Sequence, residues 1–274
     1  MPKTPRADSA GTDTPARYLR FVALGDSFTE GLDDPYPDGT FRGWADRFAD
    51  LLAAQEPQVR YANLAVRGKK IDQVVDEQVP AALALQPDLV SFAAGVNDVL
   101  RPKVDISHIA TQIESSIRDL KAAGSQVILT CVGDPSRRSA LLGRVAGRIE
   151  EYDGHLRSIG AAYGCAVMDF WGVEVFDDER CWSVDRLHLS PIGHDRVARA
   201  AADVLGFGDD TWRDLLPPAT NTPWLQRRRL DIEWAYSYLG PWVGRRLRGT
   251  SSGDSVLAKR PRLTPVLRAE SSWA

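Results

Sequence analysis

The sequence predicts an α/β protein whose parallel sheet is covered by helices on both faces. Three observations predict this class. Five short apolar runs end in glycine or polar turn residues, longer segments of helical periodicity separate them, and 43% of the 274 residues are hydrophobic. Strands that alternate with helices favour right-handed βαβ crossovers, which place helices on both faces of a parallel sheet. A chain of this length can bury a large core.

Apolar runs define the expected strands. The first contains aromatic and β-branched residues and stops at Gly25, as a buried strand does before a turn. The full set is Tyr18–Leu24, Val59–Leu64, Asp88–Ala94, Gln126–Val132 and Cys165–Phe170. In sheets of this kind ligands bind beyond the carboxyl ends of the strands, so residues that follow these runs should share one rim.

Segments of helical periodicity lie between these runs. The expected helices are Gly43–Gln55, Ile71–Leu85, Ile106–Ala123, Leu141–Tyr163 and Pro191–Leu205. In the first of them Trp44, Phe48 and Leu52 fall on one face, which indicates a side packed against the sheet. Ser190 is suited to cap the last helix, with Pro191 in its first position.

The N-terminus and the cysteines indicate a cytoplasmic protein. Residues 1–17 are rich in Pro, Thr, Asp and Ala and lack the apolar core of a secretory signal, so we expect a disordered leader. No stretch reaches the roughly 18 apolar residues that a bilayer-spanning helix needs. The three cysteines, Cys131, Cys165 and Cys181, have no CxxC spacing, which favours reduced thiols over a zinc or redox site.

Residues 207–274 form an extension of different character from the body of the chain, which we place at 18–206. The stretch Thr211–Ala274 holds eleven Arg or Lys and five Asp or Glu, a balance of +6 in a chain of net charge −3, so the rest carries −9. It also holds five of the eight tryptophans. We expect a basic, Trp-rich helix at about 223–239 and an extended or disordered segment after Gly249.

Three roles for this extension are open. Its positive balance favours docking on the acidic body of the same chain. Tryptophan and arginine on an amphipathic helix also suit an anionic membrane surface. Clusters such as Arg245-Arg246-Leu-Arg248 suit a nucleic-acid or protein partner. We favour the first role and expect neither nucleic acid nor membrane as a partner.

Ser27 follows the first strand in Gly25-Asp26-Ser27. A strand-to-helix turn holds a side chain at the rim of a sheet, where a nucleophile must sit. Taken alone, a serine at such a place more often only caps the next helix. The assignment therefore depends on a base, an orienting acid and oxyanion donors elsewhere in the chain.

Asp185-Arg-Leu-His188 can supply the base and its orienting acid. One turn of chain would bring the Asp185 carboxylate onto His188 Nδ1 and leave Nε2 facing Ser27. Taken alone, the pair could equally be a surface ion pair. For His194, in the first turn of the next helix, we expect a structural or pocket-lining role. A zinc site of these residues is disfavoured because no two histidines lie four apart on one helix face.

Two turns can supply oxyanion donors. Gly68 follows the second strand, and no side chain screens its backbone N–H. Asn97, in Gly95-Val-Asn97-Asp98, follows the third strand and can present a side-chain amide. Each could also be an ordinary turn residue.

Together these segments resemble the SGNH, or GDSL, hydrolase family over roughly Tyr18 to Leu205. The resemblance implies a flavodoxin-like, three-layer α/β/α fold with a five-stranded parallel sheet. It implies that Ser27 is the nucleophile, that His188 is general base and then general acid, and that Asp185 orients His188. The oxyanion would be bound by the N–H groups of Ser27 and Gly68 and by Asn97. The reaction implied is ester hydrolysis through an acyl-enzyme, without metal or organic cofactor.

The loops around Ser27 carry the candidate substrate contacts. The turn-rich segment Gly31–Gly43 is expected to form a pocket wall with Tyr36, Phe41 and Arg42, and Trp182 precedes Asp185 in a second loop. The acidic residues of the first segment are expected to be solvated; they are Asp33, Asp34 and Asp38.

Small or short-chain acyl esters are the favoured substrates, because nothing in the sequence specifies a long acyl channel. A carbohydrate O-deacetylase or a thioesterase of the same fold is the alternative within enzymes. A non-catalytic binding module that uses the basic extension is the alternative outside them. The sequence leaves the oligomeric state open.

Overall fold

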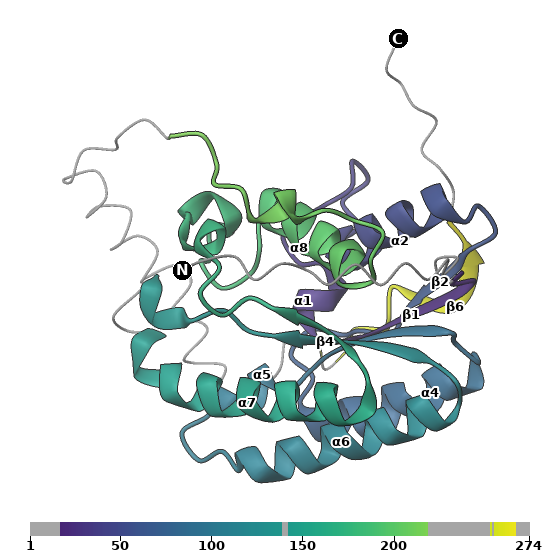
Figure 1. The fold of residues 1–274 in the computed structure, drawn as a ribbon, viewed down its shortest axis with the longest axis horizontal. Helices are drawn as coiled ribbons and strands as arrows, with labels where there is room; N and C mark the ends of the chain where they lie inside the picture. The colour runs from purple at the N-terminus through teal and green to yellow at the C-terminus, as the bar shows by residue number, and fades with distance from the viewer. Residues whose placement is uncertain (1–16, 139–141, 219–252, 254, 267–274) are drawn as a thin grey trace, which may run out of the picture.

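The structure, a computed structural model, describes residues 17–138, 142–218, 253 and 255–266 (Figure 1). In this part of the chain six strands form one sheet in the order β5-β4-β3-β1-β2-β6. The strands are β1 (Arg20–Gly25), β2 (Arg60–Asn63), β3 (Leu89–Ala93), β4 (Gln126–Cys131), β5 (Ala166–Asp169) and β6 (Arg260–Pro265). The five predicted strands pair in parallel, and β6 runs antiparallel to β2.

Helices cover both faces of the sheet, as the sequence predicts (Figure 1). The helices are α1 (Ser27–Glu30), α2 (Gly43–Gln55), α3 (Ile71–Gln73), α4 (Val79–Ala84), α5 (Val96–Val99), α6 (Ile106–Ala122), α7 (Ala146–Tyr163) and α8 (Pro191–Val204). On one face α2 and α8 bury a cluster that includes Trp44 and Val197, and on the other α4, α6 and α7 bury a second. Among the described residues no helix is long and apolar enough to cross a membrane.

The strand order places a ligand site at β1. From β1 the chain first goes to β2 on one side. It then crosses back over β1 to β3 on the other side, so the strand order reverses direction at β1. The crevice at such a switch point, beyond the carboxyl end of the strand, is where open α/β sheets bind ligands. Ser27 comes directly after β1 and therefore lies at this crevice.

Two expected helices differ in detail from the observed ones. The helix expected at Leu141–Tyr163 begins at Ala146, after a 3₁₀ turn at Leu142–Val145. The helix expected at Ile71–Leu85 contains a π-helical turn, Val74–Gln78, between α3 and α4. Pro80 lacks the N–H that a regular helix would bond to the carbonyl four residues earlier, which accounts for the wider turn before it.

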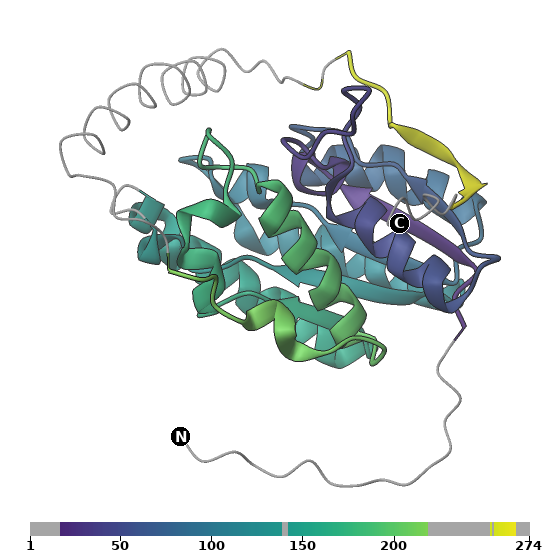
Figure 2. The ribbon, with the colours of Figure 1, turned by 90° about the horizontal axis from the view of Figure 1, so that it is seen from above.

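The expected five-stranded sheet has a sixth strand, which comes from the C-terminal extension. Strand β6 lies along the outer edge of β2 (Figure 2). Earlier in the extension, Trp212 is buried against α8, so the segment after residue 206 also joins the core. A residue pattern that looks merely extended becomes a strand because β2 offers an unpaired edge. The expected leader and the expected helix at about 223–239 lie outside the described residues, except for Arg17.

Lys259 anchors the extension to the body just before β6. Its Nζ lies 3.0 Å from the Phe41 carbonyl oxygen, 2.6 Å from that of Arg42 and 2.8 Å from Asp46 Oδ1. Burial acts to lower the pKa of Lys259, and the Asp46 carboxylate opposes that effect. The extension therefore contacts the body at this point, whereas the helix for which docking was predicted lies outside the described residues.

We predict that Lys259→Met lowers the free energy of unfolding by about 2–3 kcal/mol, because it leaves the buried Asp46 carboxylate without its cation. Urea denaturation measures the change. Arg262→Met, on an exposed position of the same strand, is the matched control and should change it by less than about 0.5 kcal/mol. Equal effects of the two substitutions would contradict the anchoring role of Lys259.

Candidate active site

The turn between β1 and α1 is built to present Ser27. Gly25 has φ +149°, and a Cβ there would lie 2.4 Å from the Ala93 carbonyl oxygen, so only glycine fits. The Gln78 side chain accepts from the Gly25 N–H and donates to its carbonyl, both at 2.9 Å. Asp26 caps α1 by accepting from the Phe28 N–H at 3.1 Å. Ser27 is thus the first residue of a short helix at the rim.

Ser27, His188 and Asp185 form one hydrogen-bonded chain. His188 Nε2 lies 2.9 Å from Ser27 Oγ, and His188 Nδ1 lies 2.6 Å from Asp185 Oδ2. The other carboxylate oxygen of Asp185 accepts from the backbone N–H groups of His188 and Leu187, at 2.9 and 2.8 Å. Asp185 therefore fixes the tautomer with the proton on Nδ1, which leaves Nε2 to accept from the serine hydroxyl.

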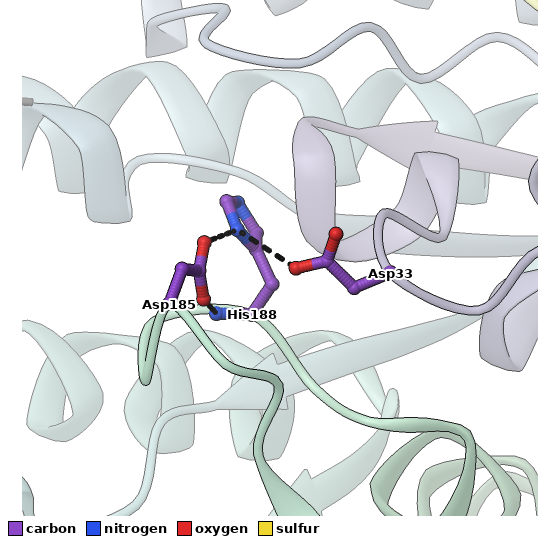
Figure 3. Close-up of side chains that lie close together, drawn as sticks. All are labelled: Asp33, Asp185 and His188. Carbon is purple, nitrogen blue, oxygen red and sulfur yellow. Dashed lines mark hydrogen bonds and ion pairs between the residues drawn. The ribbon is translucent and has the colours of Figure 1, made fainter. Parts of the chain in front are cut away.

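A second carboxylate, Asp33, lies beside the imidazole (Figure 3). Asp33 Oδ2 is 3.9 Å from His188 Nδ1. The Ser183 hydroxyl lies between the two acids, 2.6 Å from Asp33 Oδ2 and 2.8 Å from Asp185 Oδ1. The φ of +67° at Asp33 turns the chain so that its carboxylate comes back toward the site. Asp33 contacts a residue 155 positions away, and no local pattern in the sequence indicates this.

The expectation that the acids after Gly31 are solvated is wrong for Asp34, which is buried in a two-pronged pair with Arg47, at 2.7 and 2.9 Å. The Asp33 side chain lies beside His188 and is still 38% exposed. Asp38 is exposed, as expected. Composition alone cannot separate the three, because the difference arises from where the folded loop lies.

Charges around His188 decide its protonation. Burial acts to lower the pKa of His188, but the hydrogen bond to Asp185 and the negative charges of Asp185, Asp33 and Asp26 outweigh it and raise the pKa above its ordinary value. Burial acts to raise the pKa of Asp185, yet the bond to His188, the imidazolium charge and the backbone N–H groups hold it well below its usual range. The site thus stabilises the imidazolium that forms when serine gives up its proton.

His194 has a different environment and a structural role, as expected. Its Nδ1 accepts from the Trp44 backbone N–H at 3.0 Å, so Nε2 carries the proton and donates to the Leu32 carbonyl oxygen at 3.0 Å. It is fully buried, and burial lowers its pKa to about 4. Both ring nitrogens are therefore committed to the backbone, which leaves none to ligate a metal.

Of the two expected oxyanion donors, Asn97 lines the same cavity as Ser27, and Gly68 lies next to Lys69, whose carbonyl oxygen Asn97 contacts. Gly68 has φ +73°, and its N–H donates to no group among the described residues. Asn97 Nδ2 lies 2.9 Å from Asp26 Oδ2 and 3.1 Å from the Lys69 carbonyl oxygen. The Asn97 amide must therefore share a hydrogen with an incoming oxyanion. Asp26 is buried, and burial raises the pKa of its carboxyl group to about 6.

A cavity of about 210 Å³ opens at Ser27, His188 and Asn97. Trp182 lines it, as expected, together with mainly apolar side chains. The expected contacts from the other loop lie outside it, because each has a partner within the protein. Tyr36 bonds Asp46 at 3.2 Å, Phe41 stacks under Arg67, and Arg42 pairs with Asp50 at 2.6 Å.

This sheet, with a Ser–His–Asp chain at its switch point, defines an α/β serine hydrolase. The chain belongs to the GDSL-like lipase/acylhydrolase family, whose model matches residues 23–196, and it is a carboxylic ester hydrolase. The predicted resemblance is therefore confirmed.

Similar proteins include an acetylxylan esterase of Geobacillus stearothermophilus, 26% identical over 69% of this chain and 94% of that one. The crystal structure of an acetylxylan esterase from that organism superposes with a TM-score of 0.59 and 20% identity, over 70% of this chain and 97% of the other. An alpha/beta hydrolase from the metagenome of Lake Arreo gives a TM-score of 0.59 and 21% identity, over the same shares. These structural matches show the fold.

We predict that Asp33→Asn moves the acidic limb of the pH profile of kcat/KM to lower pH. The negative charge of Asp33 raises the pKa of His188, and the reaction needs the neutral imidazole, so removing the charge makes the base available at lower pH. Asp38→Asn, in the same loop and exposed, should leave the limb in place. An unmoved limb in Asp33→Asn would show that this charge does not act on His188.

Proposed function

We propose that this chain hydrolyses carboxylic esters through an acyl-enzyme on Ser27. The observation that carries the proposal is the continuous Ser27–His188–Asp185 chain, with contacts of 2.9 and 2.6 Å. His188 Nε2 takes the proton as Ser27 Oγ attacks the ester carbonyl carbon, and then gives it to the leaving alkoxide. Water then attacks the acyl-enzyme while His188 takes its proton, and His188 returns that proton to Ser27 Oγ as the carboxylic acid leaves.

The tetrahedral intermediates need hydrogen-bond donors for their oxyanion. The N–H groups of Ser27 and Gly68 donate to no described residue and are available for this task. Asn97 adds a third donor by sharing an amide hydrogen that now faces Asp26 or the Lys69 carbonyl. Donors held by the fold before the substrate arrives lower the barrier because they need no reorganisation.

The family supports a small-molecule ester as the substrate class. Deacetylation of carbohydrate is the second candidate, and the observation that favours it is the similarity to an acetylxylan esterase over 94% of that protein. All three cysteines are free thiols, in keeping with the predicted cytoplasmic location, which stays a prediction.

We predict that Ser27→Ala lowers kcat/KM for p-nitrophenyl esters by at least about 10³-fold and abolishes labelling by a fluorophosphonate probe, because both need the Ser27 hydroxyl. Initial rates and the mass of the intact labelled protein measure the two effects. Ser107→Ala, exposed on α6, is the control and should match the wild type. Undiminished hydrolysis by Ser27→Ala would remove Ser27 from the reaction. A wild type that neither hydrolyses esters nor reacts with the probe would indicate a binding module.

Asn97→Ala should lower kcat by about 10²–10³-fold with little change in KM, because an oxyanion donor acts in the transition state and not on the bound ester. Steady-state kinetics with one ester separates the two parameters. A rise in KM at constant kcat would instead make Asn97 a ground-state contact.

A further inference from the structure

The cavity beside Ser27 continues into a second one. The second cavity, of about 120 Å³, shares eight lining residues with the first. Among these shared residues are Leu100, Val132, Phe170, Phe176 and Trp182, so the junction is apolar. The two cavities therefore form one cleft that begins at the reacting serine and leads away between α5 and the 182–187 loop.

Two polar side chains along this cleft are bonded within the protein, whereas the buried Thr130 hydroxyl has no partner among the described residues. The Tyr152 hydroxyl donates to the Ala94 carbonyl oxygen at 2.6 Å. Asp26 accepts from Asn97 and from the Phe28 N–H. A sugar would need several free hydrogen-bonding groups in the wall, whereas an alkyl chain needs only apolar surface removed from water, and apolar side chains make up most of this lining.

One ion pair lies at the outer cavity. Arg137 and Asp177 bind each other at 2.5 Å. The Arg138 guanidinium lies 3.2 Å from the centre of the Trp182 ring and donates to the Arg186 carbonyl oxygen at 2.5 Å. The ring contact and the carbonyl bond hold the Arg138 guanidinium against the wall of the outer cavity.

The volume of the first cavity indicates how many carbons of an alkyl chain it can hold. An apolar cavity of about 150 Å³ holds benzene, which has six carbons. By the same measure a cavity of about 210 Å³ has room for roughly eight carbons. An acetyl group would leave most of this space unfilled, and an unfilled apolar cavity adds nothing to binding.

We propose that the cleft binds the acyl part of the substrate and that the preferred esters carry unbranched acyl chains of six to eight carbons. This inference rests on the proposed reaction at Ser27. The acyl group stays bonded to Ser27 Oγ through both halves of the reaction, so a deep cleft beside that atom can hold it throughout. The alcohol must leave with its proton from His188, and water must then take its place, so that side has to stay open.

The first test is a series of p-nitrophenyl esters from acetyl to dodecanoyl, each below its aggregation concentration. We expect kcat/KM to rise by about fourfold per added methylene up to octanoyl and to level off beyond it. Acetyl esters as the best substrates, or no dependence on acyl length, would overturn the proposal. Ethyl, hexyl and octyl acetates, followed by acid release, form the second arm. A rise along this alcohol series would place the alcohol in the cleft and overturn the proposal too.

The second test changes the cleft itself. Leu100→Trp fills space at the junction of the cavities and should lower the octanoyl-to-acetyl ratio of kcat/KM at least tenfold, whereas Leu51→Trp, exposed on α2, should leave the ratio unchanged. Leu100→Ala widens the junction and should move the acyl length with the highest kcat/KM to longer chains. This variant tests the proposal if Leu100→Trp does not fold. An unchanged ratio in a folded Leu100 variant would overturn the proposal.

Failure of this inference differs from failure of the proposed function. If esters are hydrolysed through Ser27 without regard to acyl length, only the assignment of the cleft fails. If no ester is hydrolysed and the fluorophosphonate probe does not label Ser27, the reaction itself is wrongly assigned.

Discussion

The contact of 2.9 Å between Ser27 Oγ and His188 Nε2 joins residues 161 positions apart, and much of the fold acts to hold it. At the serine end, Gly25 packs against the Ala93 carbonyl and its peptide is bonded on both sides by Gln78. At the histidine end, a Cβ on Gly193 would lie 2.2 Å from the Cys181 carbonyl oxygen. Only glycine lets the start of α8 pack so closely against Cys181, and this packing brings together the two ends of the loop that carries His188.

His188 and His194 have pKa values shifted in opposite directions by their surroundings, and they have different roles. His188 faces Asp185, Asp33 and Asp26, whose charges and hydrogen bonds raise its pKa. His194, six positions later, is enclosed by the core, where burial lowers its pKa to about 4. At neutral pH His194 therefore stays neutral and ties the Leu32 carbonyl to the start of α2, while His188 can accept and release a proton. The tie from His194 also helps to fix the loop that brings Asp33 to His188.

Local pattern and motif predicted the strands, their parallel pairing and the residues Ser27, Asp185 and His188. Each of these depends on chain segments whose periodicity or spacing is visible over a few residues. Asp33, Ser183 and Gln78 were missed because their partners are far away in the sequence. The contacts depend on loop conformations such as φ +67° at Asp33, which aspartate adopts more readily than most residues but which its presence alone does not predict. Strand β6 was missed because its sequence, with two prolines, becomes a strand only at the free edge of β2.

The extension has a physical link to the site, although it lies beyond the part matched by the family model, which ends at residue 196. Lys259 binds the carbonyls of Phe41 and Arg42, at the end of the loop that begins beyond Ser27 and contains Asp33. A Cβ on Gly253 would lie 1.9 Å from the Arg67 carbonyl oxygen, so the extension also packs against the segment that presents Gly68. Two segments next to the site therefore contact residues outside the part matched by the family model. The extension thus contacts the loop that carries Asp33 and the residue next to Gly68, so its docking acts on the two segments that carry these groups.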